Sequence, residues 1–255
     1  MSLETVVFLV CIGLFGGAWN AVAGGATLFT FPALMAAGLP PVVANATNYL
    51  AMLPSNAAAL PAYRRELAGV GSAIWPLIIV SGLGAIVGSL LLLISGEQLF
   101  EALIPALVLA ATALFAFGER IRAALVDGLK GASTGLLLYA ALFAFSIYGG
   151  YFGAGLGIIL LAIVQIMGFS SFHVANSLKN LLATSFTILS IGVFGVSGLI
   201  AWPEAVVVMC GSTLGGYFGA RWARLVNERY LRAAVICFGL TLAGIYIAKA
   251  FGLWA

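Results

Sequence analysis

The chain has 255 residues, of which 63% are hydrophobic and 7% charged, and its mean hydropathy is +1.17. A soluble domain carries about 25% charged residues, so this composition excludes a soluble protein and predicts an all-α integral membrane protein. The net charge of +3 is too small to indicate a nucleic-acid partner. The three cysteines lie in apolar segments without metal-ligand spacing, so we expect small buried core residues, no metal and no cofactor.

The first apolar element, at residues 5–37, is too long for one straight crossing of about 20 residues. Asn20 and the sequence Ala23-Gly24-Gly25 interrupt it, which predicts a glycine-broken helix or a re-entrant hairpin. Three apolar segments of spanning length follow, and we expect transmembrane helices at 42–63, 69–93 and 99–117.

A polar stretch at 118–131 precedes a second half with the same plan. Residues 132–168 are again overlong, and the glycine-rich run from Gly149 to Gly157 breaks them. Helices of spanning length are then predicted at 172–196, 200–221 and 230–251.

A shift of 131 positions aligns the two halves. It brings Gly24 onto Gly155, Asn45 onto Asn176 and Glu97 onto Glu228. Matches of Asn, Glu and Gly at one offset indicate an internal duplication. We therefore predict two repeats, 1–117 and 132–255, joined by a cytoplasmic linker at 118–131.

The distribution of Lys and Arg then predicts the membrane topology, because these residues gather on the cytoplasmic side. If each broken element crossed the bilayer once, the ten loop and end charges would divide six to four. If each element enters and leaves on the same side, only Lys249 lies opposite the other nine. The second arrangement predicts inverted repeats in the cell membrane, with both termini outside the cytoplasm. The cytoplasmic loops would carry Arg64, Arg65, Arg120, Arg122, Arg221 and Arg224.

The segment from Ala175 to Asn180 carries a polar stripe inside an apolar run. On a helix, Asn176, Lys179 and Asn180 share one face, because they are three and four positions apart. Lysine at bilayer depth is costly and usually functional, so we expect it to bind an anion. The alternative is that Lys179 reaches back to the interface with its long stem.

The first half repeats this stripe without the charge, between Ala44 and Asn48. Helix starts at the glycine breaks would point N–H groups toward a bound anion. For Asn45 and Asn48 the alternative is helix–helix hydrogen bonding. His173 is a candidate for proton relay, and the alternative is an interfacial or capping role. The expected substrate-binding residues are Asn20, Gly24, Gly25, Asn45, Thr47, Asn48, Gly155, Asn176, Ser177, Lys179 and Asn180.

Two motifs carry a family resemblance. A glycine-broken element runs into Gly38-Leu39-Pro40-Pro41-Val42-Val43-Ala44-Asn45-Ala46-Thr47-Asn48, and a second copy runs from Gly149 through Gly168 to Asn180. Over essentially its whole length the chain resembles the TauE/SafE family of sulfite exporters. This resemblance implies export of sulfite, sulfoacetate or a related organosulfur anion, although many members have no assigned substrate.

We therefore expect a secondary transporter of a small anion, sulfite or an organosulfonate, that works by alternating access around a midplane site. The alternatives are a passive anion channel and a transporter of another small anion such as a carboxylate. An enzyme is not expected, because the sequence offers one His and no catalytic constellation in the membrane. The lipid bilayer is the expected surrounding, and a homodimer is compatible with the composition.

Overall fold

The computed structural model describes all residues except 23–24, 58–59, 129–134, 170, 223–227 and 251–255. In the described part every regular element is a helix. The helices are α1 (Leu3–Val22), α2 (Thr27–Ala36), α3 (Pro41–Ala57), η1 (Leu60–Tyr63), α4 (Arg64–Val70), η2 (Gly71–Ala73), α5 (Ile74–Gly128), α6 (Gly135–Tyr151), α7 (Leu156–Ile166), α8 (Phe172–Val196), α9 (Trp202–Trp222) and α10 (Glu228–Ala250). Three stretches among them are long and apolar enough to cross a membrane: Leu3–Asn20, Arg64–Ala124 and His173–Val196.

Each overlong apolar element is a pair of helices. Element 5–37 contains α1 and α2, and element 132–168 contains α6 and α7. Gly25 and Gly155, just before the second helix of each pair, have φ angles of +77°. Glycine adopts this left-handed backbone without the steric cost of a Cβ, which explains why the breaks fall at glycines.

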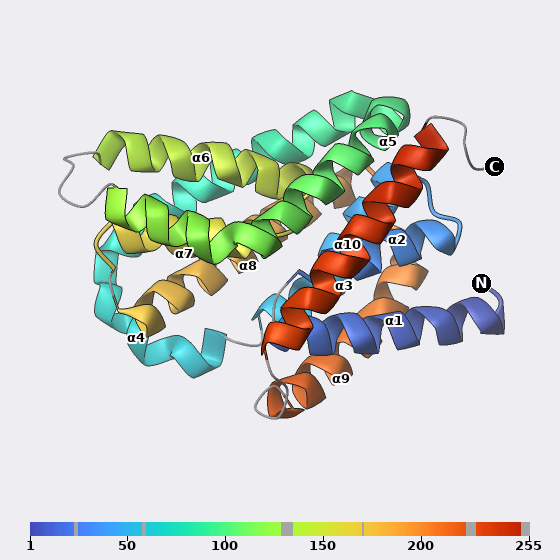
Figure 1. Ribbon diagram of the computed structural model, residues 1–255, viewed down its shortest axis with the longest axis horizontal. Coiled ribbons are helices and arrows are strands. Elements are labelled where there is room, and N and C mark those ends of the chain that lie inside the picture. Colours follow the sequence, from blue (N-terminus) through green and yellow to red (C-terminus); the bar gives the residue numbers. More distant parts are fainter. Residues whose placement is uncertain (23–24, 58–59, 129–134, 170, 223–227, 251–255) are drawn as a thin grey trace.

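The two helix pairs enter the molecule from opposite ends. In Figure 1, α1 runs from the right-hand end toward the middle, and α6 runs in from the left-hand end. Helices α2 and α7 return toward the ends from which α1 and α6 came. Each pair is thus a hairpin with its break near the middle of the molecule.

Helix α5 covers two predicted helices and part of the predicted linker. It bends at Gly96, whose φ of 67° and ψ of 176° are not helical, so two arms meet there. The second arm continues through Gly118 to Gly128, because the Glu, Arg, Leu and Ala residues of this polar stretch favour a helix.

Between α3 and α5, the observed helix bounds differ from the predicted ranges. Helix α3 ends at Ala57, before the predicted residue 63, and the short helices η1, α4 and η2 precede α5. Pro61 in this region lacks the N–H that a continued α-helix would need. Helices α8, α9 and α10 begin and end within two residues of their predicted ranges. Which helices cross the bilayer stays a prediction.

The two halves of the chain exchange packing partners. Helix α1 packs along α9, and α6 packs along the first arm of α5. A Cβ on Gly215 would collide with the carbonyl of Leu14, and one on Gly88 with the carbonyl of Ile147. Glycines therefore permit the close approach of both helix pairs, as small residues do in membrane proteins.

The expectation that the cysteines are buried is wrong. Cys11, Cys210 and Cys237 are free and exposed on the outside of the helix assembly. A small apolar side chain faces lipid tails as favourably as it faces a protein core, so apolar surroundings in the sequence do not distinguish the two locations.

Candidate functional site

One cavity of about 500 Å³ lies where the two broken elements meet α3 and α8. Gly25 and Ala26 at the first break and Gly153 to Gly157 at the second line it together. Phe152, at the second break, packs its ring against Phe31 of α2 and Phe100 of α5, at centroid distances of 5.5 and 6.4 Å. This aromatic contact joins the second break to α2 and α5.

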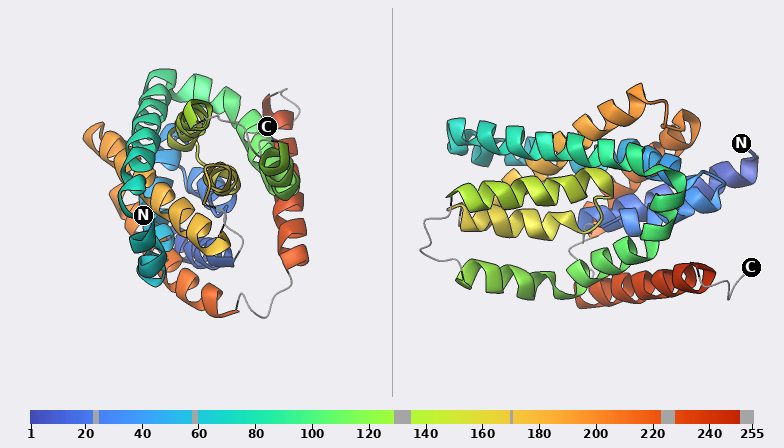
Figure 2. Two further views of the ribbon diagram at one scale, coloured as in Figure 1. Left: turned by 90° about the vertical axis from the view of Figure 1, so that its left-hand side faces the viewer. Right: turned by 90° about the horizontal axis from the view of Figure 1, so that it is seen from above.

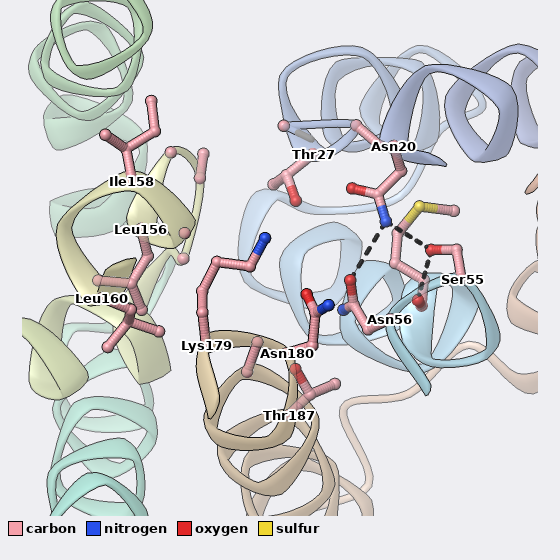
Figure 3. Close-up of a pocket in the computed structure, with 18 of the residues that line it drawn as sticks. Asn20, Thr27, Ser55, Asn56, Leu156, Ile158, Leu160, Lys179, Asn180 and Thr187 are labelled. Atoms are coloured by element: carbon pink, nitrogen blue, oxygen red, sulfur yellow. Dashed lines mark hydrogen bonds between the residues drawn. The ribbon is translucent and has the colours of Figure 1, made fainter. Parts of the chain in front are cut away.

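The polar face of α8 lines one side of the cavity through Asn176, Lys179 and Asn180. Asn176 Nδ2 donates a hydrogen bond of 2.8 Å to the hydroxyl of Tyr63 in η1. Lys179 reaches from α8 into the cavity toward Thr27 (Figure 3), and its stem passes Gly157 at the start of α7. Lys179 makes no hydrogen bond or ion pair within the part of the chain that the structure describes.

The first break and α3 provide a cluster of amides and hydroxyls on the other side. Asn20 Nδ2 donates to Ser55 Oγ at 2.8 Å and to Asn56 Oδ1 at 3.2 Å (Figure 3). Asn48 Nδ2 donates to Thr27 Oγ1 at 3.3 Å. All five residues line the cavity.

Two helices begin at the cavity wall. Helix α2 starts at Thr27 and α7 at Leu156, and neither has a side-chain hydrogen bond at its N-cap. The macrodipole places a partial positive charge at each helix start. At α2, Leu28 N and Phe29 N donate to the carbonyls of Gly25 and Ala26, so the dipole contributes there more than free N–H groups do. Lys179 is the one charged side chain among the described lining residues, so the cavity is electropositive without a counter-charge.

Several predicted site residues lie elsewhere. Asn45 is buried and donates to the carbonyl of Tyr151 at 2.9 Å, while its own Oδ1 has no partner among the described residues. Thr47 Oγ1 accepts from Ala201 N at the start of α9, at 3.0 Å. Both side chains thus contact other helices outside the cavity lining, and their predicted binding roles stay predictions.

The remaining predicted residues lie outside the cavity lining or outside the described part of the chain. Ser177 is buried and donates to the carbonyl of Val174 at 2.7 Å, outside the cavity lining. His173 is exposed at the start of α8 and does not line the cavity. Gly24 lies outside the described residues, as do Arg224 and the side chain of Arg221.

The C-terminal end of α6 is held by donors from other helices. Tyr49 of α3 donates to the carbonyl of Gly149, and Ser89 of α5 donates to the carbonyl of Gly150 at 3.3 Å. Within the hairpin, Tyr148 donates to the carbonyl of Ala154 at 2.7 Å. These carbonyls at the buried end of the broken helix are thereby satisfied, as backbone at membrane depth would require.

Among the polar residues of the cavity, sequence reasoning missed Thr27, Tyr49, Ser55, Asn56 and Tyr63. Ser55 and Asn56 continue the α3 face that carries Asn48, about two turns further along. Extending the helical spacing of that stripe past Met52 would have found both residues. Tyr63 and Thr27 carried no comparable signal, because their places at the cavity depend on how η1 and α2 fold back.

The family assignment follows from the sequence comparison. The model of the family described as sulfite exporter TauE/SafE matches residues 9–247. The chain belongs to the TauE/SafE family.

Curated TauE/SafE relatives match over nearly their full length. A probable membrane transporter protein of Haemophilus influenzae is 30% identical over 248 residues, which cover 96% of each chain. Probable membrane transporter protein ORF9 of a Sinorhizobium species is 26% identical over 244 residues, which cover 95% of this chain and 92% of the relative. Probable membrane transporter protein YfcA of Escherichia coli K12 is 28% identical over 245 residues, which cover 96% of this chain and 90% of the relative.

No solved structure shows a significant match. The family and the apolar helices identify this TauE/SafE chain as a multi-pass membrane transporter protein. Membership of a transporter family is consistent with transport rather than catalysis. In the searched, described part of the chain, no three His, Cys, Asp or Glu side chains cluster as metal ligands would.

Proposed function

We propose that this TauE/SafE chain is a secondary transporter of a small anion, sulfite or an organosulfonate, and that it works by alternating access around the cavity. The observation that carries the proposal is the unpaired Lys179 ammonium, which shares the cavity with the uncapped N-termini of α2 and α7. An unpaired cation at membrane depth costs several kcal/mol. A helix N-terminus adds to that cost, because its partial charge is also positive. A bound anion offsets both terms.

The cavity also offers neutral donors to an anion. An amide carries two N–H donors, and the amides of Asn176 and Asn180 both line the cavity. Asn176 uses one of its donors on Tyr63 and keeps the other. Lysine supplies a compact point charge on a flexible stem, whereas arginine would fix one bidentate geometry. A single lysine therefore suits an anion of low charge whose position changes during transport.

Alternating access is supported by the arrangement of the hairpins. Inverted repeats with broken helices that meet around one site are typical of secondary transporters. Helices α1 and α6 run inward from opposite ends (Figure 1), and residues of both breaks line the cavity. Rocking one hairpin against the other would expose the site alternately to the two sides.

Replacing Lys179 tests the proposed role directly. A hydrogen bond to a charged group contributes about 1.5–3 kcal/mol, so Lys179→Gln should weaken anion binding by roughly 10- to 100-fold. Binding of sulfite and of small sulfonates to purified protein is the measurement. Arg120→Gln is the matched control, because it removes the same charge from an exposed position outside the cavity. Unchanged affinity in a folded Lys179→Gln protein would contradict the proposal.

Flux measurements separate a transporter from a channel. In proteoliposomes a transporter with one alternating site should show flux that saturates with anion concentration and exchanges labelled for unlabelled anion. A passive channel with the same polar lining would show uptake that follows the membrane potential and does not accelerate when anion is present inside.

A further inference from the structure

The cavity has two walls of different chemistry. Figure 3 shows Leu156, Ile158 and Leu160 of α7 on one side of Lys179, and the cluster of Asn20, Ser55 and Asn56 on the other. Three further apolar side chains line the cavity, namely Leu161 of α7 and Ala183 and Phe186 of α8. The positive charge thus lies between a hydrogen-bonding wall and an apolar wall.

The volume of the cavity is large for a bare oxyanion. A water molecule occupies about 30 Å³ in the liquid, so about 500 Å³ has room for roughly sixteen waters. Sites for small organic ligands typically measure about 300–1,000 Å³ and are mostly apolar with a few placed polar groups. An inorganic oxyanion would leave the α7 wall in contact with water.

We propose that the preferred substrate is an amphipathic organic monoanion whose charged head binds at Lys179 and whose apolar tail lies along the α7 wall. This inference rests on the proposed function, because it takes anion binding at Lys179 as given. Leu161 and Ala183 then determine the chain length that the site accepts. Both are half-buried and line the cavity, so they are free to contact a tail, whereas Leu156 and Leu160 are buried in the core.

A homologous series of ligands tests the inference. Purified protein is titrated with sulfite and with unbranched alkyl sulfonates from methanesulfonate to hexanesulfonate. Burial of each methylene should raise the affinity by up to about fourfold, so the longer sulfonates should bind more tightly than sulfite. Alkyl carboxylates of the same lengths identify the preferred head group, and the same dependence on chain length is expected for them.

The results distinguish this inference from the proposed function. If sulfite and short sulfonates bind through Lys179 but affinity does not rise with chain length, the inference is overturned and the proposed function stands. If no anion of either series binds to the folded protein, both are overturned.

Two variants locate the tail. Leu161→Ala should reduce the gain in affinity per methylene and leave the affinity for methanesulfonate unchanged. Ala183→Leu should exclude hexanesulfonate while methanesulfonate still binds. Leu214→Ala is the matched control, because Leu214 is 52% exposed on α9 and does not line the cavity. An unchanged length dependence in both folded cavity variants would contradict the placement of the tail, and the native series decides the inference if a variant fails to fold.

Discussion

The asymmetry of the site is visible in single residues. The shift of 131 positions that relates the two halves brings Asn48 onto Lys179. Asn48 is tied to the first turn of α2, since it accepts from Thr30 Oγ1 at 2.5 Å and donates to Thr27. Lys179 lies beside the start of α7, where Gly157 offers no such partners. At equivalent positions, Asn48 is therefore hydrogen-bonded to α2, whereas Lys179 has no partner among the described residues.

Tyr49 provides a test of how the second break is held. Tyr49→Phe removes the hydroxyl that donates to the carbonyl of Gly149, so that buried carbonyl loses a donor. A buried polar group without its partner costs about 1–3 kcal/mol, and we expect a lower thermal unfolding temperature in detergent. Tyr217→Phe is the control, because Tyr217 is 66% exposed on α9. Equal unfolding temperatures for the two variants would show that the hydroxyl of Tyr49 does not stabilise the break.

The sequence predicted some site residues and not others, for physical reasons. Lys179 and Asn180 could be found because a polar stripe in an apolar helix is visible at helical spacing. Asn45 shares such a stripe but lies against the C-terminus of α6, and spacing alone does not distinguish these locations. The contact between Tyr63 and Asn176 joins residues 113 positions apart, so it depends on tertiary structure. The binding roles of the cavity residues stay predictions.

At the scale of elements, glycine contacts should limit how closely helices pack. A Cβ at Gly88 would collide with backbone atoms of Ile147 and Tyr151, so one of the two helices would have to shift. Such overpacking typically costs about 1–3 kcal/mol, so Gly88→Ala should lower the thermal unfolding temperature in detergent.

Gly192 is the matched control for this prediction. A Cβ at Gly192 in α8 meets no atom within 4 Å. Alanine also favours a helix over glycine by roughly 0.5–1 kcal/mol, so Gly192→Ala should leave stability unchanged or raise it. If both alanine variants behave alike, close glycine packing does not determine the contact between α5 and α6.

The elements themselves were predictable to different degrees. The overlong segments with internal glycines indicated breaks, and helix pairs separate near those glycines. The bend at Gly96 and the continuation of α5 to Gly128 were harder to predict from the sequence. By composition, a polar stretch between apolar segments is typical of a linker. Its residues nevertheless favour a helix locally, so the preceding helix continues through it.

At the scale of the whole molecule, the ends of the helices group in a way that tests the topology. Helix α1 begins and α10 ends at one end of the long axis, while α5 ends at the other end (Figures 1 and 2). Helix α4, with Arg64 and Arg65, lies at the same end as Arg120 and Arg122. Under the positive-inside rule we expect this arginine-bearing end to be cytoplasmic.

Thiol labelling measures this orientation. In a background without Cys11, Cys210 and Cys237, Ser2→Cys should react with a membrane-impermeant maleimide in intact cells. Ala124→Cys should react only after permeabilisation; both positions are exposed, so access to the reagent decides the result. Labelling of both positions in intact cells, or the reverse pattern, would contradict the predicted topology.

The exchange of partners between the halves also has a consequence for the order of events during synthesis. Helix α1 packs along α9, which begins about 180 residues after α1 ends. At roughly 5–20 residues per second, α1 is present for roughly 10–40 s before its partner exists. During this time the face of α1 that later packs on α9 contacts lipid or a temporary neighbour. The contact that the first helix of the chain leaves open is therefore closed only late in synthesis, when α9 arrives.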